Sequence, residues 1–417
     1  MPQSPSSAEL ESLLVEAYPA LARDVRARPE DVAMLARGTR QPRDARTYRR
    51  LLASAIDDPA DRTAVLRGLR RFASREKLRI AARELLAHPG QDVDVTSREL
   101  ADLAEVCCEA ALAEALAWAE GRFGAPLTSA GARCPIVVLG MGKLGGRELN
   151  AGSDIDLILF YETDDGAAGS LSLHEYFTRV AQRFVANLDE PTEHGIVWRV
   201  DLRLRPEGST GPIVNALSAA ERYYETWGRT WERAALVRAR PVAGDAAFGK
   251  ALLQALAPFI WRRTVDPRVV DEVVAMLARA RAEANDETRE DLKIGPGGIR
   301  EVEFFVQSLQ LVWGGRHPRM RATNTLDALR RLRAGGFVTE REEVDLAGSY
   351  LFLRRLEHRI QFATGQQTHA LPRDPAMLGC IARSLGFDGA KGLESELARV
   401  RARVTERFVA LGREPTR

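Results

Sequence analysis

Apolar residues return every three or four positions along the first part of the chain, which is the spacing that buries one face of a helix. From Ala8 to about Phe123 this pattern predicts helices, and Leu69 and Phe72 belong to one such apolar face. The same segment carries the arginines Arg67, Arg70, Arg71 and Arg75. We interpret them as a solvated or internally paired helix face rather than as a stripe that binds nucleic acid.

Segments typical of strands are confined to the middle of the chain. The runs Pro135–Gly140, Asp154–Tyr161 and Gly195–Arg205 are rich in β-branched and apolar residues and are bounded by glycine or polar turns. Between the second and third runs, Leu173–Leu188 has helical spacing. From Ala219 onward the pattern predicts helix almost to the end of the chain.

These segments predict an α+β fold, in which a mostly helical chain holds a small mixed-sheet domain that is followed by a helical bundle. We expect an N-terminal helical region over residues 1–130, an α/β core over 131–240 and a C-terminal helical bundle over 241–417, beginning near Pro241. A length of 417 residues suits two or three domains, and an apolar share of 45% suffices for a substantial core.

Composition argues against several classes of protein. The chain has no uninterrupted apolar run of about 18 residues, so we expect no membrane-spanning helix and no membrane partner. Its first residues, MPQSPSSAELESLL, carry acids where a secretory signal peptide needs basic and then apolar residues. The four cysteines form no C-x-x-C pair and suggest no disulfide framework, which favours a reduced, cytoplasmic compartment. A formal net charge of +2 gives no reason to expect a nucleic acid partner.

A glycine-rich stretch follows the first strand, and two nucleotide-binding folds compete for it. Gly140, Gly142 and Gly145 spell G-x-G-x-x-G, and Glu162 lies 20 residues beyond the second glycine, as in a dinucleotide-binding Rossmann fold. The helix of that fold needs about ten or more residues, but only Gly145–Leu149 is available before NAGS interrupts the pattern. Its second strand is also buried on both faces, whereas this one opens with two carboxylates. We therefore reject the Rossmann interpretation.

Asp154 and Asp156 begin the second strand. Residues two apart on a strand point to the same face, so the two carboxylates project together while Ile155, Leu157 and Leu159 pack away from them. Two adjacent carboxylates repel each other unless a cation lies between them. Mg²⁺ prefers oxygen ligands and commonly leaves positions open for phosphate oxygens. The pair therefore points to a magnesium site beside a phosphate, although a lone D-x-D also occurs on exposed strand ends.

The third strand repeats this arrangement. We expect one face to be apolar, with Trp198, Val200, Leu202 and Leu204, and the other to be polar, with Arg199, Asp201, Arg203 and Arg205. Three acids with nearby arginines are what two-metal phosphoryl transfer needs, because the metals align the attacking and leaving oxygens and neutralise the phosphate. The preceding glycines let backbone amides approach the phosphate closely.

These residues carry a family resemblance. Gly142–Lys143, followed by Ser153–Asp156 and a later strand aspartate, resembles the nucleotidyltransferase superfamily of DNA polymerase beta type. Longer motifs resemble the glutamine synthetase adenylyltransferase/adenylyl-removing enzyme family, and they cover nearly the whole chain. They are GMGKLGGRELNAGSDIDLI, RVDLRLRPEGSTGP (Arg199–Pro212), ERYYETWGRTWERAALVRARPVAGD (Glu221–Asp245) and KIGPGGIREVEFFVQ (Lys293–Gln307).

The resemblance implies one of two opposite reactions. The family's full enzyme has two homologous halves: one attaches AMP from ATP to a tyrosine of glutamine synthetase, and the other removes it by phosphorolysis, releasing ADP. GGIREVEF and LFLRRLEHRIQFATGQQTHALP (Leu351–Pro372) are similar to the amino-terminal, removing half, so deadenylylation is the favoured reaction. The alternatives are the adenylyltransferase reaction and a non-catalytic module that binds nucleotide or PII signal protein. The chain is shorter than the family's two halves together.

The resemblance also implies the roles of particular residues. Asp154, Asp156 and Asp201 are expected to be catalytic and to hold Mg²⁺, as two ions. Nucleotide or phosphate contacts are expected at Gly142, Lys143, Ser153, Arg203 and Arg205, and further cleft residues at Arg300, Glu301 and Glu303. Most of these residues also have a purely structural interpretation. Lys143 could lie in solvent, and Ser153 could cap a turn. Arg203 and Arg205 could form surface ion pairs, and Arg300, Glu301 and Glu303 could form an ion-pair network within one helix. The implied partners are adenylylated glutamine synthetase, inorganic phosphate, an adenine nucleotide and PII signal protein.

Two tryptophans lie four residues apart, which on one helix would place them on the same face. We interpret Trp227 and Trp231 as core residues rather than as a platform on which adenine stacks. No spacing of histidines and cysteines suggests a zinc site.

Overall fold

The protein is described by a computed structural model over residues 6–27, 31, 32, 35, 41–86, 92–264, 266, 268–283 and 290–413. The helices before the central sheet are α1 Ser7–Ala17, the 3₁₀ turn η1 Pro19–Leu21, α2 Ala22–Ala27, α4 Ala45–Ala53, α5 Arg62–Leu85 and α6 Val93–Phe123. Asp61 begins α5 by accepting hydrogen bonds from the backbone N–H groups of Thr63 and Ala64, which would otherwise lack a partner. The helices predicted over this region are confirmed where the structure describes it.

The arginine-rich face of α5 is largely paired within the protein. Arg70 is fully buried and donates to the backbone carbonyls of Asn187, Glu190 and Gly195, so it holds the loop that follows α8 (Leu173–Asp189). Arg67 pairs with Asp57 and Arg75 with Glu76. The paired interpretation is confirmed for these three arginines.

Two sheets are present in the described residues. The central one contains β2 Ile136–Gly140, β3 Ile155–Tyr161, β6 Val200–Asp201, β7 Val214–Ala216 and β8 Arg240–Gly244, and a small antiparallel sheet contains β1 Leu127–Thr128, β4 Gly166–Ala168 and β5 Leu171–Ser172. In the central sheet, β2 pairs antiparallel with β3 on one edge and with β8 on the other. The second edge of β3 pairs parallel with β6 near its start and with β7 near its end. The sheet is therefore mixed, as predicted.

The remaining elements lie between and after these strands. Between strands lie α7 Gly142–Gly145, α8, the 3₁₀ turn η2 Gly208–Thr210, α9 Leu217–Thr226 and α10 Thr230–Leu236. After β8 come α11 Ala246–Ala255, α12 Ala257–Ile260, α13 Arg268–Glu283, α14 Ile299–Trp313, η4 Pro318–Met320, α15 Thr325–Ala334, α16 Glu340–Thr364, α17 Pro375–Ser384 and α18 Ala390–Arg413. The predicted α+β class, mostly helical with a small sheet, is confirmed.

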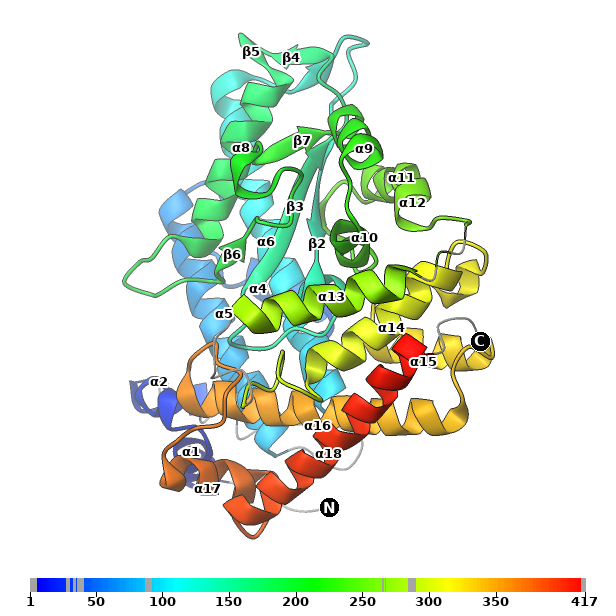
Figure 1. Ribbon diagram of the computed structural model, residues 1–417. Coiled ribbons are helices and arrows are strands. Elements are labelled where there is room, and N and C mark those ends of the chain that lie inside the picture. The colour runs from blue at the N-terminus through cyan, green and yellow to red at the C-terminus, as the bar shows by residue number, and fades with distance from the viewer. Residues whose placement is uncertain are drawn as a thin grey trace.

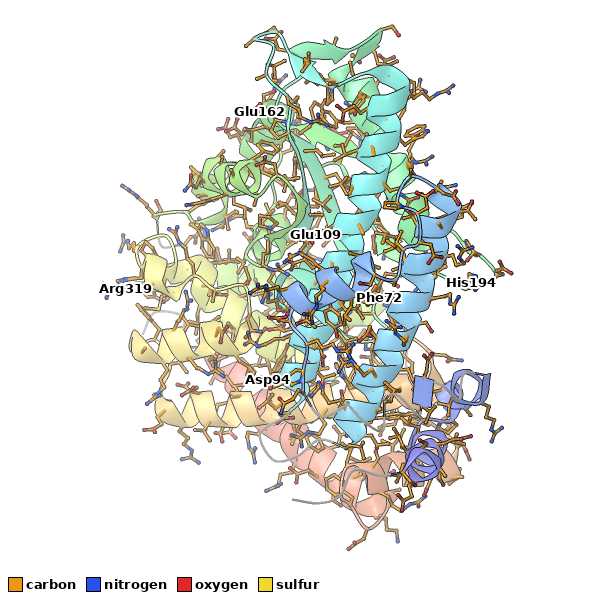
Figure 2. All side chains as sticks on the ribbon, turned by 180° about the vertical axis from the view of Figure 1, so that it is seen from behind. Phe72, Asp94, Glu109, Glu162, His194 and Arg319 are labelled. Carbon is orange, nitrogen blue, oxygen red and sulfur yellow. The ribbon has the colours of Figure 1, made fainter. Side chains whose placement is uncertain are left out.

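Strand alternation divides the core into two parts. Ile155, Leu157 and Leu159 of β3 pack in a cluster with α4, α5, α6 and α8, whereas Ile158 and Phe160 pack toward the helices that follow β8. Figure 1 shows the sheet between these two helical groups, with α13 passing in front of it. From behind, Figure 2 shows α5 and α6 side by side, where Phe72 packs against Tyr48 of α4. The face of β3 that carries the even-numbered residues therefore looks toward the C-terminal helices.

The third predicted strand is much shorter than expected. Only Val200 and Asp201 of the run Gly195–Arg205 pair as a strand. The backbone turns directly afterwards, because the Arg203 N–H donates to Asp201 Oδ1 at 2.8 Å and the Arg205 N–H donates to the Leu202 carbonyl. The predicted polar face that alternates through Arg203 and Arg205 is wrong beyond Asp201.

The expectation of helix from Ala219 onward is wrong at β8. Pro241 lies in this edge strand, where the missing N–H of proline is tolerated, and the register with β2 shifts between Val138 and Leu139 opposite it. Proline therefore marks a sheet edge here rather than the start of a helical block. The three expected domain ranges stay a prediction. No helix of the described residues has the length and apolar character needed to cross a membrane.

Candidate active site

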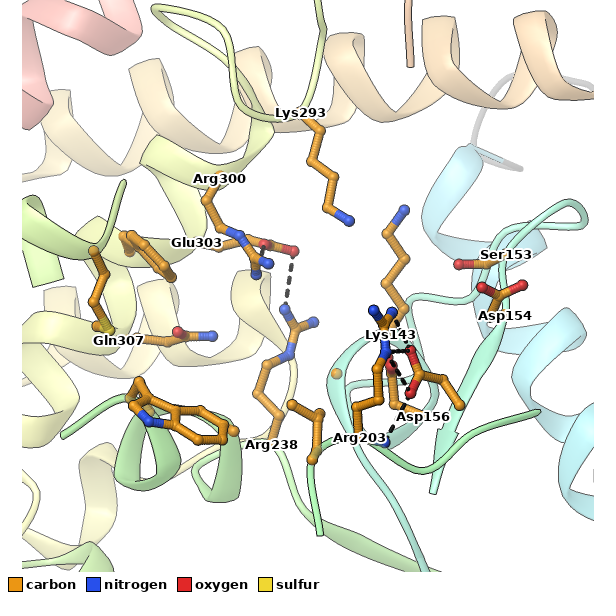
Figure 3. A pocket seen from close by; sticks show the side chains of 18 of the residues that line it. Lys143, Ser153, Asp154, Asp156, Arg203, Arg238, Lys293, Arg300, Glu303 and Gln307 are labelled. Carbon is orange, nitrogen blue, oxygen red and sulfur yellow. Dashed lines mark hydrogen bonds and ion pairs between the residues drawn. The ribbon is translucent and has the colours of Figure 1, made fainter. Parts of the chain in front are cut away.

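A cleft of about 500 Å³ opens at the end of the sheet where β3 begins (Figure 3). Its charged and polar lining comprises Lys143, Ser153, Asp154, Asp156, Asp201, Arg203, Arg238, Lys293, Arg300, Glu303, Gln307 and Gln367. The rest of the lining consists of Gly142, Leu204, Trp231, Ala234, Ala235, Met276 and Phe304. The three aspartates singled out in the sequence thus line one cleft, together with residues from α10, α13 and α14.

Asp156 and Asp201 are partners in the parallel register of β3 and β6, one residue after Ile155 and Val200. Register partners on neighbouring strands project to the same face, so the two carboxylates lie side by side. Burial raises the pKa of Asp156 to about 6, and the negative charge of Asp201 adds to this effect. No hydrogen bond or ion pair to the Asp156 carboxylate is found among the described residues.

Gly142 explains why a glycine begins the turn before the aspartates. Its φ is +49°, in the left-handed region that disfavours side chains. A Cβ atom there would lie 2.7 Å from Asp156 Oδ2, so any other residue would push against that carboxylate. The helix that follows, α7, has only four residues. The Rossmann interpretation, which needs a long helix at this point, is therefore excluded by the structure as well.

Asp154 and Asp201 are each engaged by an arginine. Arg199 Nε donates to Asp154 Oδ1 at 2.5 Å, and its Nη2 donates to the Gly152 carbonyl at 2.8 Å. Burial would raise the pKa of Asp201, but hydrogen bonds from Arg203 outweigh burial and lower it. With these ion pairs in place, no three His, Cys, Asp or Glu side chains of the described chain are arranged to hold a metal ion. Arg203 is thus both a cleft residue and an ion-pair partner.

Cationic side chains face these carboxylates. Lys143 is buried, and its Nζ lies 2.9 Å from Glu357 Oε1 of α16, so the alternative that it lies in solvent is wrong. Burial lowers the pKa of Lys143 to about 8, although the charge of Glu357 opposes the shift. Figure 3 shows Lys143 and Lys293 extending into the same space, with Arg300 beside them. Burial would raise the pKa of Glu357, but Lys143 and other nearby cations hold it well below its usual value.

Three residues in the first turns of α14 were expected to line the cleft, and the structure places them on two different sides of the helix. Arg300 and Glu303 line the cleft. Burial would raise the pKa of Glu303, but Arg238, whose Nη1 lies 2.9 Å away, and Arg300 lower it to about 2. Glu301 points away from the cleft and accepts a hydrogen bond from Arg281 of α13. The expectation that Glu301 is a cleft residue is not met, because it lies on the face of α14 that packs on α13.

Arg205 stabilises the turn after β6. Its guanidinium donates to the carbonyls of Leu202, Ser209, Gly211 and Pro212, which fixes the turn after β6, and it does not line the cleft. Ser153 does line the cleft, directly before Asp154. Of the five expected phosphate contacts, the structure therefore brings four together, and Arg205 supports their loop.

The two tryptophans do not lie on one helix, because α9 ends at Thr226 and α10 begins at Thr230. Trp227 is 72% exposed and Trp231 lines the cleft, so the expectation that both are core residues is wrong. Sequence reasoning also gave no role to Gln307 and Gln367, which both line the cleft. Gln367 belongs to the Q-Q-T-H string, and its Oε1 accepts a hydrogen bond from Arg199 at 3.1 Å.

A small mixed sheet with a glycine turn, paired strand aspartates and a cationic wall is the arrangement of a nucleotidyltransferase. Comparison with known families agrees with this class. Residues 10–255 match the sequence model of glutamate-ammonia ligase adenylyltransferase, and residues 271–411 match that of GlnD PII-uridylyltransferase. The chain belongs to the glutamate-ammonia ligase adenylyltransferase family, which is the family that the sequence motifs resemble.

Curated relatives carry the name bifunctional glutamine synthetase adenylyltransferase/adenylyl-removing enzyme. The relative from Thioalkalivibrio sulfidiphilus is 42% identical over 379 residues, which are 88% of this chain and 38% of the relative. The relative from Burkholderia pseudomallei is 41% identical over 408 residues, which are 93% of this chain and 44% of the relative. The chain therefore spans about two fifths of the length of these relatives.

Proposed function

We propose that the protein removes AMP from an adenylylated tyrosine of glutamine synthetase by phosphorolysis, giving ADP and unmodified glutamine synthetase. The observation that carries the proposal is the pairing of Asp156 with Asp201 beside a cationic cleft wall. The names of the relatives support glutamine synthetase as the substrate. The likeness of GGIREVEF and QQTHALP to the removing half of the family supports this direction of reaction.

We further propose that Asp156 and Asp201 hold Mg²⁺, as two ions when Asp154 leaves Arg199 and joins them. The donor set fits a hard divalent cation, because Asp156 presents a carboxylate that has no hydrogen-bond partner among the residues the structure describes, next to a second carboxylate. Bound Mg²⁺ supplies positive charge to the phosphate and orders the two oxygens of the displacement.

The side chains of the cleft then have separate tasks. Lys143, Lys293 and Arg300 hold inorganic phosphate opposite the AMP group, and their charges offset the repulsion between the two phosphates. A phosphate oxygen forms a bond to the α-phosphorus while the bond from phosphorus to the tyrosine oxygen breaks. The electron pair leaves with tyrosine, which takes up a proton, and the nucleotide departs as ADP. The backbone turn at Gly142 keeps Asp156 close to the transferred group.

PII signal protein is a second proposed partner. Support comes from the match of residues 271–411 to a PII-uridylyltransferase model, which covers most of α13–α18. We also propose a cytoplasmic location, which the four free cysteines support.

The test is incubation of adenylylated glutamine synthetase with the protein, Mg²⁺ and phosphate, followed by chromatography of the nucleotides. We expect ADP from the wild type and a loss of at least about 100-fold in rate for Asp156→Asn and Asp201→Asn. Asp57→Asn, which alters an exposed aspartate of an Arg67 ion pair, should keep the wild-type rate. Release of AMP would contradict phosphorolysis. Transfer of label from α-labelled ATP onto glutamine synthetase, without ADP formation, would favour the adenylyltransferase reaction.

A further inference from the structure

The cleft has two chemically different ends. The carboxylates and lysines gather at the start of β3, whereas Trp231 of α10, Met276 of α13 and Phe304 of α14 contribute apolar surface to the same cleft. Apolar and aromatic walls with one or two polar groups are typical of pockets that bind flat organic ligands. The apolar end of the cleft therefore offers a surface that the binding of phosphate alone does not need.

Gln307 is the polar group of this second end. The residue is only 6% exposed, it lines the cleft, and Figure 3 shows its amide directed into the open space. No hydrogen bond to this amide is found among the described residues, so its donor and acceptor are available to a ligand in the cleft. Three residues further along α14, Gln310 donates to the carbonyls of Met320 and Ala322. The helix thus satisfies one buried glutamine and leaves the amide of the other facing the cleft.

An amide presents one donor and one acceptor side by side. Adenine carries the same pair in complementary order, because its 6-amino group donates and the adjacent ring nitrogen accepts. A tryptophan ring can stack on any purine, so it contributes affinity without selecting the base. The cleft accordingly contains one group suited to stacking and one suited to reading the 6-amino group.

We infer that the apolar end of the cleft binds the adenine ring, with Trp231 stacked on it and the Gln307 amide hydrogen-bonded to its 6-amino edge. This inference rests on the proposed function, since it assumes that the phosphates of the nucleotide lie at the carboxylate end. It assigns base selectivity to α14, the helix whose first turn supplies Arg300 to the phosphate end. The two ends of the nucleotide are then held by one helix.

Calorimetric titration with two nucleotides tests the inference without glutamine synthetase. The ligands are ADP and purine riboside diphosphate, which lacks only the 6-amino group, each with Mg²⁺. The wild type should bind ADP about tenfold more tightly, the size expected for one hydrogen-bonded edge. In Gln307→Leu this preference should disappear because ADP loses the hydrogen bonds of both its 6-amino group and its ring nitrogen, whereas the analogue loses only the bond to its ring nitrogen and weakens less. A preference that persists in Gln307→Leu would overturn the assignment of Gln307.

Variants of Trp231 test whether this side chain stacks on the base. Trp231→Ala should weaken both ligands about tenfold or more, because stacking does not depend on the 6-amino group. Trp231→Phe keeps an aromatic face and should retain most of the affinity, which separates stacking from misfolding. Trp227→Ala changes an exposed tryptophan outside the cleft and should bind like the wild type. Equal binding by Trp231→Ala and wild type would overturn the stacking assignment.

Variants are first compared by circular dichroism, and Gln307→Met replaces Gln307→Leu if the latter does not fold. Methionine has a similar length but no carbonyl oxygen to accept a hydrogen bond from the 6-amino group, so it should also lose the preference for ADP. The outcomes distinguish this inference from the proposed function. ADP binding with unchanged selectivity in both Gln307 variants would overturn only the inference. If the wild type binds neither nucleotide in the presence of Mg²⁺, both fail.

Discussion

Asp156 of β3 and Asp201 of β6 stand opposite each other in parallel register, and in the described part of the chain an arginine pairs with Asp201 but none pairs with Asp156. Arg203 holds the pKa of Asp201 below its usual value, whereas burial and the charge of Asp201 raise the pKa of Asp156 to about 6. In the folded protein, the two carboxylates therefore repel each other. A bound divalent cation would relieve it.

Asp156→Asn should stabilise the protein in the absence of metal while abolishing its activity. The folded-state pKa of about 6 lies above the ordinary value of 3.8. Stability from this group is therefore present at low pH and is lost as pH rises from about 4 through about 6. At pH 7.5 the variant should gain roughly 1–3 kcal/mol, since one pKa unit corresponds to about 1.4 kcal/mol. Denaturant unfolding in EDTA measures this gain. A variant less stable than the wild type at pH 7.5 would contradict the repulsion.

Metal binding should depend on both members of the pair. Mn²⁺ can replace Mg²⁺ at oxygen-rich sites and is counted by electron paramagnetic resonance. Asp201→Asn should weaken Mn²⁺ binding in the presence of ADP by at least about tenfold, because one charged ligand is lost. The exposed Asp57→Asn serves as the matched control. Unchanged Mn²⁺ affinity in Asp201→Asn would remove Asp201 from the metal site.

Phosphate affinity should fall above pH 8. Burial lowers the pKa of Lys143 to about 8, so its positive charge is present below this pH and is lost above it. We expect the KM for phosphate to rise between pH 8 and 9.5 in the wild type. Lys143→Met should have a KM raised about tenfold at pH 7 and little further change with pH.

Lys77 provides the control for this pH profile. It is also a buried lysine with a pKa lowered by burial to about 8, but it donates to the Val197 carbonyl and does not line the cleft. Lys77→Met should keep the rise in KM above pH 8. A profile that flattens in Lys77→Met and persists in Lys143→Met would contradict the role of Lys143.

Gly142→Ala should reduce activity more than its effect on stability explains. The φ of +49° costs about 1–2 kcal/mol for a residue with a side chain. The added Cβ would also displace Asp156 Oδ2, so we expect the rate to fall at least about tenfold. Gly131 has a φ of +78° but no atom within 4 Å of an added Cβ. Gly131→Ala should therefore lose comparable stability and keep its activity, and equal rates for the two variants would contradict the positional argument.

Local patterns predicted the centre of the fold well. The apolar runs of β2 and β3 and the periodic helix α8 follow from alternation and helical spacing, and both aspartates of the D-x-D pair line the cleft. The β8 strand was missed because proline usually interrupts a sheet, while at an edge it costs little. β6 was overestimated because the hydrogen bond from the Arg203 N–H to Asp201 turns the chain after two strand residues.

The features of the site that the sequence could not reveal depend on contacts between segments that are distant in the chain. Lys143 and Glu357 are 214 positions apart, and Arg199 and Gln367 are 168 positions apart. Such pairs arise only when α16 and the loop after it pack across the sheet end. The break between α9 and α10, which separates Trp227 from Trp231, did have a local signal, because Gly228 directly follows the C-cap residue of α9.

The most direct test of the proposed phosphorolysis traces labelled inorganic phosphate while the protein is incubated with adenylylated glutamine synthetase and Mg²⁺. If the protein transfers AMP from tyrosine to phosphate, the label appears as the β-phosphate of ADP in amounts equal to the tyrosine set free. If the label stays in inorganic phosphate while glutamine synthetase loses AMP, or if AMP is retained throughout, the proposed reaction is contradicted.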